Sequence, residues 1–137
     1  IADGSIPTEY KGRIWPVHRL DTPTSGLVLF AKSPEAAGAL VAAFRNKQVA
    51  KYYVALSGKK PGRKQGSVVG DMARSRRGTW KLLRTCTDPA VTRLWSTGVP
   101  EVRPGLRLWL VKPETGRTHQ IRVALKSNAS PVLGDMG

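Results

Sequence analysis

The segment VHRLDTPTSG, residues 17–26, contains a single acid, Asp21, close to the basic residues His18 and Arg19. An ionised carboxylate can attack an electron-poor carbon or stabilise the positive charge that develops on it, and a neighbouring arginine favours the ionised form. The alternative is an aspartate that turns the chain or pairs with a neighbouring arginine. Asp21 is therefore a candidate catalytic residue, to be judged against the rest of the sequence.

A tyrosine pair in KYYVALS, residues 51–57, offers a group that could exchange a proton. In a strand, the period of two places Tyr52, Val54 and Leu56 on one apolar face and Tyr53 on the other, beside small residues. A phenol among small residues is typical of a cleft wall, and an ordinary half-exposed tyrosine fits the same pattern. We expect Tyr53 to face a cleft and Tyr52 to pack with Val54 and Leu56.

The segment TGRTHQIRVALKSN, residues 115–128, predicts a turn that leads into a helix, with Ile121 and Leu125 as its buried seam. Arg117 and Arg122 are five residues apart, so on a helix they diverge by roughly 140°. One arginine can then point into a site while the other reaches phosphate or solvent.

The elements that must position these residues are short. Residues 27–33, LVLFAKS, predict a strand, and Ser33 is a good N-cap for a helix that continues to about Gln48. Further strands are predicted for residues 79–85, 91–97 and 106–112. We expect the tryptophans of these strands to pack within the sheet rather than to stack on bases; they are Trp80, Trp95 and Trp109.

The composition is strongly basic. The 137 residues include 23 Lys and Arg against 9 Asp and Glu, a formal charge of +14, and 40% are hydrophobic, which is too many for a disordered basic tail. Residues 51–100 carry 11 basic and 2 acidic residues, whereas residues 1–50 carry 6 and 4. A nucleic acid is the leading partner for such a charge. An anionic membrane surface and solubility alone are weaker explanations.

Residues 58–84 hold most of this charge, and their glycines keep the backbone open, so we expect a basic loop there. A solvated loop would also be basic, but the charge asymmetry favours phosphate contacts. The candidate RNA-binding residues are Lys59, Lys60, Arg63, Lys64, Arg74, Arg76 and Arg77, to which Arg117 is added.

Several classes of protein are disfavoured by what the sequence contains. One cysteine, Cys86, permits no internal disulfide, and the two histidines are not spaced as zinc ligands. No apolar run approaches the ~18 residues of a membrane span. We therefore expect a cytoplasmic protein that uses no metal and does not enter a membrane.

Three motifs in order, HRLD, KYYVAL and TGRTHQIR, make the sequence resemble the RluA branch of the RNA pseudouridine synthases. The blocks HRLDTPTSGLVLFAKS and PETGRTHQIRVAL…PVLGD match that family's two signature blocks nearly throughout, and DPAVTRLW is similar to its intervening strand. Each tetrapeptide alone would be weak, but three in the right order are specific. The resemblance runs from about Val17 to Asp135.

This resemblance implies an α+β fold, with a mixed, mainly antiparallel β-sheet flanked by helices, and one catalytic domain over residues 1–137. It implies that specific uridines in ribosomal or transfer RNA are isomerised to pseudouridine, without a cofactor or metal, and we expect a monomer. Asp21 matches the catalytic aspartate, Tyr53 the active-site tyrosine and Arg122 the arginine that pairs with the aspartate. Arg19 matches a motif arginine that can assist in displacing the target base.

The sequence also departs from the family pattern. The strands that usually precede HRLD are missing, and the chain stops just after LGDMG, so we expect a catalytic core cut at both ends. Ala124 stands where the family usually has a histidine. We expect that change to be tolerated, because the histidine is not one of the catalytic residues.

A non-catalytic basic RNA-binding module is the main alternative. Asp21, Tyr53 and Arg122 together favour catalysis, since a binding module has no need for an acid at the phosphate-rich centre of its surface. A nucleoside hydrolase is disfavoured, because neither a second suitable acid nor a calcium-binding acidic cluster accompanies Asp21.

Overall fold

Two units make up the computed structural model, Ile1–Val49 and Ala50–Gly137, and the structure describes residues 9–135. The first unit is built around one helix and the second around a β-sheet. The single domain expected over residues 1–137 stays a prediction, and its ends, residues 1–8 and 136–137, lie outside the described residues.

Helix α1 (Pro34–Arg45) is the main element of the first unit, and it begins as predicted. Ser33 has extended backbone angles, and its hydroxyl accepts the N–H of Ala36 at 3.1 Å, which satisfies one of the unpaired donors of the first turn. The helix ends at Arg45 rather than near Gln48. Two residues later Lys47 has φ +58°, a left-handed conformation that cannot continue a helix.

A two-residue ladder accompanies α1, in which β1 (Trp15–Pro16) pairs antiparallel with β2 (Phe30–Ala31). The predicted strand over residues 27–33 is therefore much longer than the observed one. One reason is that the N–H of Leu29 donates to Nε2 of His18 at 2.8 Å, so that donor is not available to a ladder.

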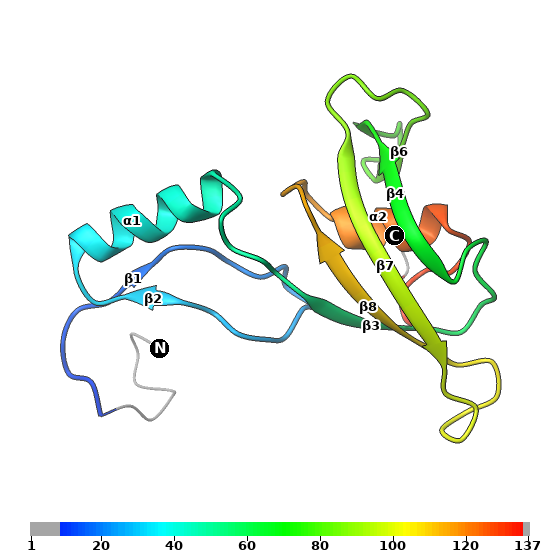
Figure 1. Ribbon diagram of the computed structural model, residues 1–137, viewed down its shortest axis with the longest axis horizontal. Helices are drawn as coiled ribbons and strands as arrows, with labels where there is room; N and C mark the ends of the chain where they lie inside the picture. Colours follow the sequence, from blue (N-terminus) through cyan, green and yellow to red (C-terminus); the bar gives the residue numbers. More distant parts are fainter. Residues whose placement is uncertain (1–8, 136–137) are drawn as a thin grey trace. The chain divides into compact units, whose positions relative to one another are not determined.

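A four-stranded antiparallel sheet forms the second unit, in the order β3-β8-β7-β4 (Figure 1). Its strands are β3 (Tyr53–Ser57), β4 (Gln65–Gly70), β7 (Ala90–Gly98) and β8 (Arg107–Pro113). A hairpin of β5 (Met72–Arg74) and β6 (Trp80–Leu82) is added, and α2 (Gln120–Ser127) lies on one face of the sheet. The predicted α+β fold with a mainly antiparallel sheet is confirmed.

The open basic stretch expected over residues 58–84 is wrong in part, because β4 and β5 lie within it. β6 falls inside the strand predicted over residues 79–85, so that strand is confirmed. Alternate residues of a strand face the same side, and Val68 of β4 and Trp80 of β6 are half-buried in this way. The glycines lie near strand ends and in turns rather than in one open loop. Gly70 shows the reason: a Cβ there would lie 2.3 Å from the carbonyl oxygen of Leu83, so only glycine permits this approach of the two segments.

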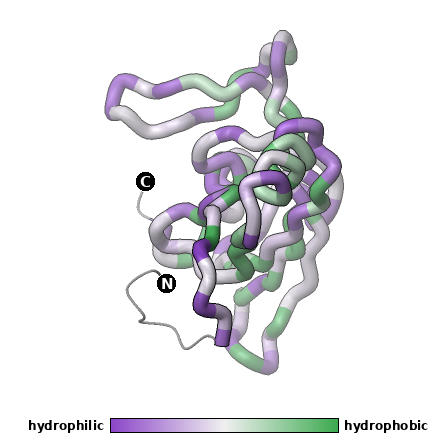
Figure 2. Tube along the Cα trace, turned by 90° about the vertical axis from the view of Figure 1, so that its left-hand side faces the viewer, coloured by the Kyte–Doolittle hydropathy of each residue, from purple (hydrophilic) through white to green (hydrophobic). Residues whose placement is uncertain are grey.

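The core of the second unit lies between the sheet and α2. It consists of Leu94, Trp109, Val111 and Leu125, each at most 2% exposed, and full burial of such side chains contributes about 1.5–3 kcal/mol each. Ile121 packs against this cluster, so the predicted helix seam is confirmed. Figure 2 shows how hydrophobic and hydrophilic positions alternate along the chain instead of forming separate blocks.

The two faces of β3 are separated as predicted, but the burial is the opposite of what we expected. Tyr53 and Ala55 pack against the core, whereas Tyr52 is 56% and Val54 71% exposed. Ala55 lies opposite Trp109 in the register, and small side chains on this face leave room for the indole. The position at which α2 packs, rather than the hydrophobicity of β3, therefore decides which face is buried.

The three tryptophans differ in their surroundings. Trp109 packs within the sheet as predicted, and its Nε1 donates to the hydroxyl of buried Ser57 at 2.8 Å. Trp95 lies on the other sheet face and is 39% exposed. Trp80 is half-buried under the guanidinium of Arg74, 5.6 Å from its ring centre, and it does not belong to the core cluster.

Candidate active site

The loop that carries Asp21 is fastened at His18. The His18 ring stacks on Phe44 of α1 at 4.8 Å between ring centres, and its Nε2 accepts the N–H of Leu29. The ring therefore joins the helix to the segment that follows the loop. The histidine of the HRLD motif thus holds together the two ends of the loop that carries Asp21.

Asp21 itself is exposed, and the loop turns there. The N–H of Thr24 donates to the carbonyl oxygen of Asp21 at 2.8 Å, which accounts for the turning role considered from the sequence. Arg19 is also exposed and forms no ion pair with Asp21 in the described part of this unit. The turn holds the backbone of Asp21 while its carboxylate remains accessible to a ligand.

Tyr53 lies at the start of β3, on the face that packs toward α2. It is half-buried, contacts the core cluster and lies opposite Val111 of β8 in the register. Tyr52 points to the other face, where the ammonium of Lys112 lies 5.7 Å from its ring centre. Only Tyr53 therefore lies on the same side of the sheet as the residues of α2.

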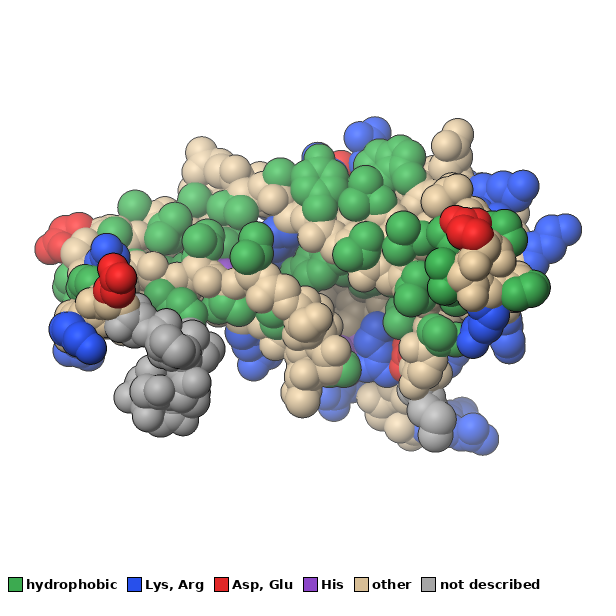
Figure 3. Space-filling model, turned by 90° about the horizontal axis from the view of Figure 1, so that it is seen from below, with side chains coloured by type: hydrophobic (Ala, Val, Ile, Leu, Met, Phe, Trp, Pro, Cys, Tyr) green, Lys and Arg blue, Asp and Glu red, His purple; other side chains and the backbone are tan. Residues whose placement is uncertain are grey.

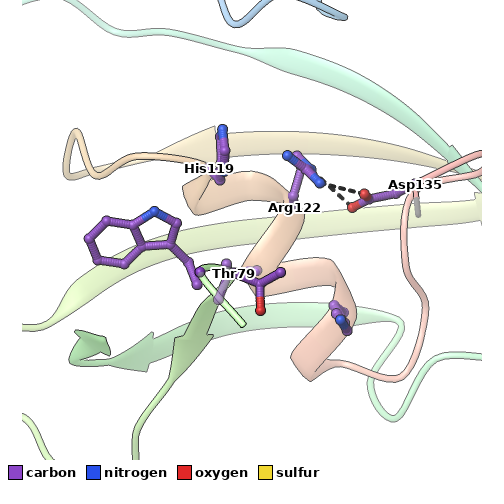
Figure 4. Close-up of a pocket in the computed structure, with 8 residues that line it drawn as sticks. Thr79, His119, Arg122 and Asp135 are labelled. Atoms are coloured by element: carbon purple, nitrogen blue, oxygen red, sulfur yellow. Dashed lines mark hydrogen bonds and ion pairs between the residues drawn. The ribbon is translucent and has the colours of Figure 1, made fainter. Parts of the chain in front are cut away.

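Arg122 extends from α2 into a pocket and forms a two-point ion pair with Asp135 (Figure 4). Its Nε donates to Oδ2 at 3.0 Å and its Nη2 to Oδ1 at 2.6 Å. The pocket is lined by Gly78, Thr79, Trp80, His119, Arg122, Val123, Lys126 and Asp135. The predicted pairing of Arg122 with Asp21 joins residues of different units and stays a prediction.

Asp135 and His119 line the pocket of Arg122 and are not among the candidate residues predicted from the sequence. Asp135 is thirteen positions from its partner, so no periodicity connects the two. His119 precedes α2 with φ +55°, a left-handed conformation in which histidine is enriched among non-glycine residues. The available signal for both residues was their place in the block PETGRTHQIRVAL…PVLGD, which matches the family's signature.

Arg117 does not lie in the helix, because α2 begins at Gln120. The expected divergence of roughly 140° between Arg117 and Arg122 is therefore wrong. Arg117 belongs to the preceding turn, and its Nη2 pairs with the carboxylate of Asp88 at 2.6 Å. Its side chain is 39% exposed, so it remains accessible at the surface.

Gln120 fixes this turn to the sheet. Its amide nitrogen donates to the carbonyl oxygen of Val91 and the hydroxyl of Thr92, both at 2.9 Å. Its amide oxygen accepts the hydroxyl of Thr115 at 2.7 Å and the N–H of Arg117 at 3.0 Å. This buried side chain therefore sets where α2 starts, and with it the direction of Arg122.

We expect Gln120→Leu to lower the free energy of unfolding by at least about 2 kcal/mol, because it leaves several polar partners unpaired at about 1–3 kcal/mol each. Gln65→Leu is the control: Gln65 is exposed on β4, and a surface change of this kind costs within about 0.5 kcal/mol. Urea unfolding of both variants measures the difference. Equal stability of the two variants would contradict the role given to Gln120.

Asp71 holds the neighbouring loop through its carboxylate. Hydrogen bonds from the side chain of Thr85 and from the backbone N–H groups of Thr87 and Asp88 lower the pKa of Asp71 from its ordinary value, and Arg117 adds to the effect. Because the folded-state pKa is lowered, this contribution to stability is present at neutral pH and is lost as the pH falls through that pKa. Asp71 thereby places Asp88 for its pair with Arg117.

The first group of candidate RNA-binding residues lies on a loop with a well-held backbone. Asn128, at the end of α2, accepts the N–H of Arg63 and donates to its carbonyl oxygen, and the hydroxyl of Ser130 donates to the carbonyl oxygen of Lys59. The side chains themselves are exposed; they are Lys59, Lys60, Arg63 and Lys64. We call residues 59–64 the basic loop.

The second group lies on the β5–β6 hairpin, at the edge of the Arg122 pocket. The hydroxyls of Ser75 and Thr79 hydrogen-bond across the turn at 2.7 Å, and Gly78 has φ +76°, which favours glycine. Arg74, Arg76 and Arg77 are exposed there. In Figure 3, Lys and Arg side chains project around the rim of the second unit.

Residues 9–135 contain no group of three or more His, Cys, Asp or Glu side chains that could hold a metal ion. Within the same range, no helix is long and apolar enough to cross a bilayer.

A family model described as RNA pseudouridylate synthase matches residues 4–127, which include Asp21, Tyr53 and Arg122. The chain is 48% identical over 123 residues to an uncharacterized RNA pseudouridine synthase of Haemophilus influenzae, covering 90% of this chain and 54% of that protein. It is 34% identical to a tRNA pseudouridine synthase C of Pasteurella multocida, covering 89% of this chain and 54% of the relative.

A ribosomal large subunit pseudouridine synthase C of Rickettsia prowazekii is 33% identical, with 87% of this chain and 40% of the relative covered. The solved structure of human RNA pseudouridylate synthase domain containing 1 superposes with a TM-score of 0.76 at 30% identity, over 90% of this chain and 54% of that one. The chain spans about half the length of the curated relatives that it matches.

Proposed function

The chain belongs to the RNA pseudouridylate synthase family, as the RluA-type resemblance predicted, and we propose that it isomerises specific uridines in structured RNA to pseudouridine. The observation that carries this proposal is the family match over residues 4–127, because it spans Asp21, Tyr53 and Arg122 together. The RNA class is transfer or ribosomal RNA, in keeping with the names of two relatives.

The reaction breaks the bond between N1 of uracil and C1′ of the ribose and forms a bond between C5 and C1′. The hydrogen on C5 leaves as a proton and N1 regains one, so atoms and electrons balance without an oxidant or a second substrate. We assign to Asp21 the attack on, or stabilisation of, the electron-poor sugar. Hydrolytic glycosidases generally need two carboxyl groups, whereas this rearrangement needs one.

Tyr53 is the candidate for proton transfer to or from the sugar or base. Its position on a strand whose register is fixed by β8 supports this role, because a strand places a side chain more rigidly than a loop does. Its ring can also stack under the flipped uracil. Arg19, beside Asp21, is the candidate for filling the space that the base vacates.

The exposed cations of the basic loop and the β5–β6 hairpin are proposed to hold the RNA backbone. A target base must leave its stack to reach a catalytic carboxylate, and phosphate contacts on either side can stabilise the distorted strand. The monomeric state and the cytoplasmic location are further proposals.

We expect the fourfold variant Lys59→Ala, Lys60→Ala, Arg63→Ala and Lys64→Ala to weaken binding uniformly across RNA sequences. The slope of log Kd against log salt should fall by roughly 0.7 for each RNA phosphate that the variant no longer neutralises. The measurement is a salt titration of binding to single-stranded RNA. A matched fourfold change at exposed cations outside the basic loop is the control, at Lys11, Lys32, Arg45 and Arg93. Equal slopes of log Kd against log salt in the two variants would show that the basic loop does not contact RNA phosphates.

The proposed function is tested by mapping pseudouridines in total RNA from cells with and without the intact gene. Loss of pseudouridine at defined positions supports it and identifies the substrate. Unchanged maps, with RNA binding retained in vitro, would support the non-catalytic binding module instead.

A further inference from the structure

We propose that Asp135 is a positioning residue, which holds the guanidinium of Arg122 in one orientation in the pocket beside the β5–β6 hairpin. The inference rests on the proposed function in one respect only, that turnover of uridine depends on where this guanidinium lies.

The geometry of the pair distinguishes it from the other ion pairs of the second unit. Both oxygens of Asp135 accept from one edge of Arg122, through Nε and Nη2, and this two-point contact fixes the plane of the guanidinium. The side chain of Asp135 is 8% exposed, whereas that of Asp88, the partner of Arg117, is 80% exposed. Glu114 meets its two cations only at 3.6 and 3.9 Å.

The backbone that delivers Asp135 is itself built for this placement. Residues after α2 return along the edge of β3, where Val132 forms a bridge with Ser57 and the N–H of Leu133 donates to the carbonyl oxygen of Leu56 at 2.7 Å. Gly134 then adopts φ +80°, a left-handed turn that side chains disfavour, and the carboxylate comes to face α2.

The charges of the pocket give the pair a second consequence. Asp135 is the only acid among the described residues that line it, beside Arg122, Lys126 and His119. It therefore offsets one positive charge where an RNA phosphate would otherwise compete for the guanidinium. Arg122 can therefore donate hydrogen bonds in a defined orientation and does not act as a further binding site for RNA phosphates.

The first test compares Asp135→Asn with Glu114→Gln, which removes the same charge from an exposed carboxylate outside the pocket. In Asp135→Asn we expect kcat to fall at least tenfold, because small displacements of a positioned group cost about this much or more. The Kd for RNA should be unchanged or lower. Glu114→Gln should keep kcat within about twofold. A kcat equal to wild type in Asp135→Asn would overturn the proposal.

A spectroscopic measurement makes the inference independent of turnover. We expect the Nε–H of Arg122 to give a protected, slowly exchanging ¹⁵N NMR signal, which Asp135→Asn loses while Glu114→Gln retains it. A signal unchanged in Asp135→Asn would overturn the proposal even if turnover fell. If wild-type protein modified no RNA, the proposed function would be wrong. The Nε–H signal of Arg122 would still show whether Asp135 holds the guanidinium in place.

Asp135→Glu keeps the charge and guards against a variant that merely fails to fold. The added methylene moves the carboxylate, so kcat should lie between those of wild type and Asp135→Asn, and the Nε–H signal should shift but remain. Melting temperatures measured in parallel show whether both variants are folded. Full wild-type kcat in Asp135→Glu would show that charge alone matters and would overturn the positioning role.

Discussion

Asp21→Asn should abolish isomerisation while RNA affinity stays equal or rises slightly. The substitution removes the proposed nucleophile and one negative charge at once, in a chain whose formal charge is already +14. The substitution should leave the loop folded, because the turn uses the backbone carbonyl oxygen of Asp21 and because His18 holds the ends of the loop together. Single-turnover loss of the uracil C5 hydrogen and equilibrium RNA binding are the two measurements.

Glu35→Gln is the matched control for Asp21→Asn, because it also removes one exposed carboxylate from the first unit. Its turnover should remain within a few fold of wild type. Substantial residual turnover in Asp21→Asn would show that another residue attacks or stabilises the sugar.

Tyr53→Phe should lose about 10² to 10⁴ in turnover, the usual range for a positioned acid or base, while fold and RNA affinity are kept. Tyr52→Phe should stay within a few fold of wild type. The structure sharpens this contrast: Tyr52 is 56% exposed beside Lys112 on the sheet face away from α2, whereas Tyr53 packs on the α2 side. Single-turnover rates with melting temperatures measured in parallel separate the two.

An inactive Tyr52→Phe with an active Tyr53→Phe would contradict the assignment of Tyr53. Since the two residues are adjacent and have opposite faces, that result would place the reacting uridine on the other side of the sheet. Loss of activity in both variants together with lowered melting temperatures would instead show a structural role for each phenol.

Local signals predicted the start of α1 and the buried seam of α2. Ser33 predicted the beginning of α1, because a capping side chain acts within the first turn of the helix. The spacing of Ile121 and Leu125 predicted the buried side of α2, because residues four apart lie on the same face of a helix. Other boundaries were predicted less well, because no pattern of residue types reveals what sets them. A contact of Leu29 delays the start of β2, and a left-handed backbone angle at Lys47 follows the end of α1. The start of α2 at Gln120 depends on contacts with the sheet.

Long-range contacts were beyond what the sequence could predict. Alternation in β3 separates Tyr52 from Tyr53, but which face is buried depends on where α2 packs. Gln120 reads as an ordinary polar helix residue until its contacts with β7 are known. The pair of Arg122 with Asp135 requires the chain to return along β3. The candidate catalytic set could be assembled only through resemblance, because three separate segments supply it.

The most direct test of the proposed activity uses transfer and ribosomal RNA transcripts that carry tritium at C5 of uridine. Incubation with the protein should release tritium into water in an amount equal to the pseudouridine formed, with no free uracil, because C5 exchanges its hydrogen for the bond to C1′. Bound RNA without tritium release, or release of free uracil in place of pseudouridine, would contradict uridine isomerisation.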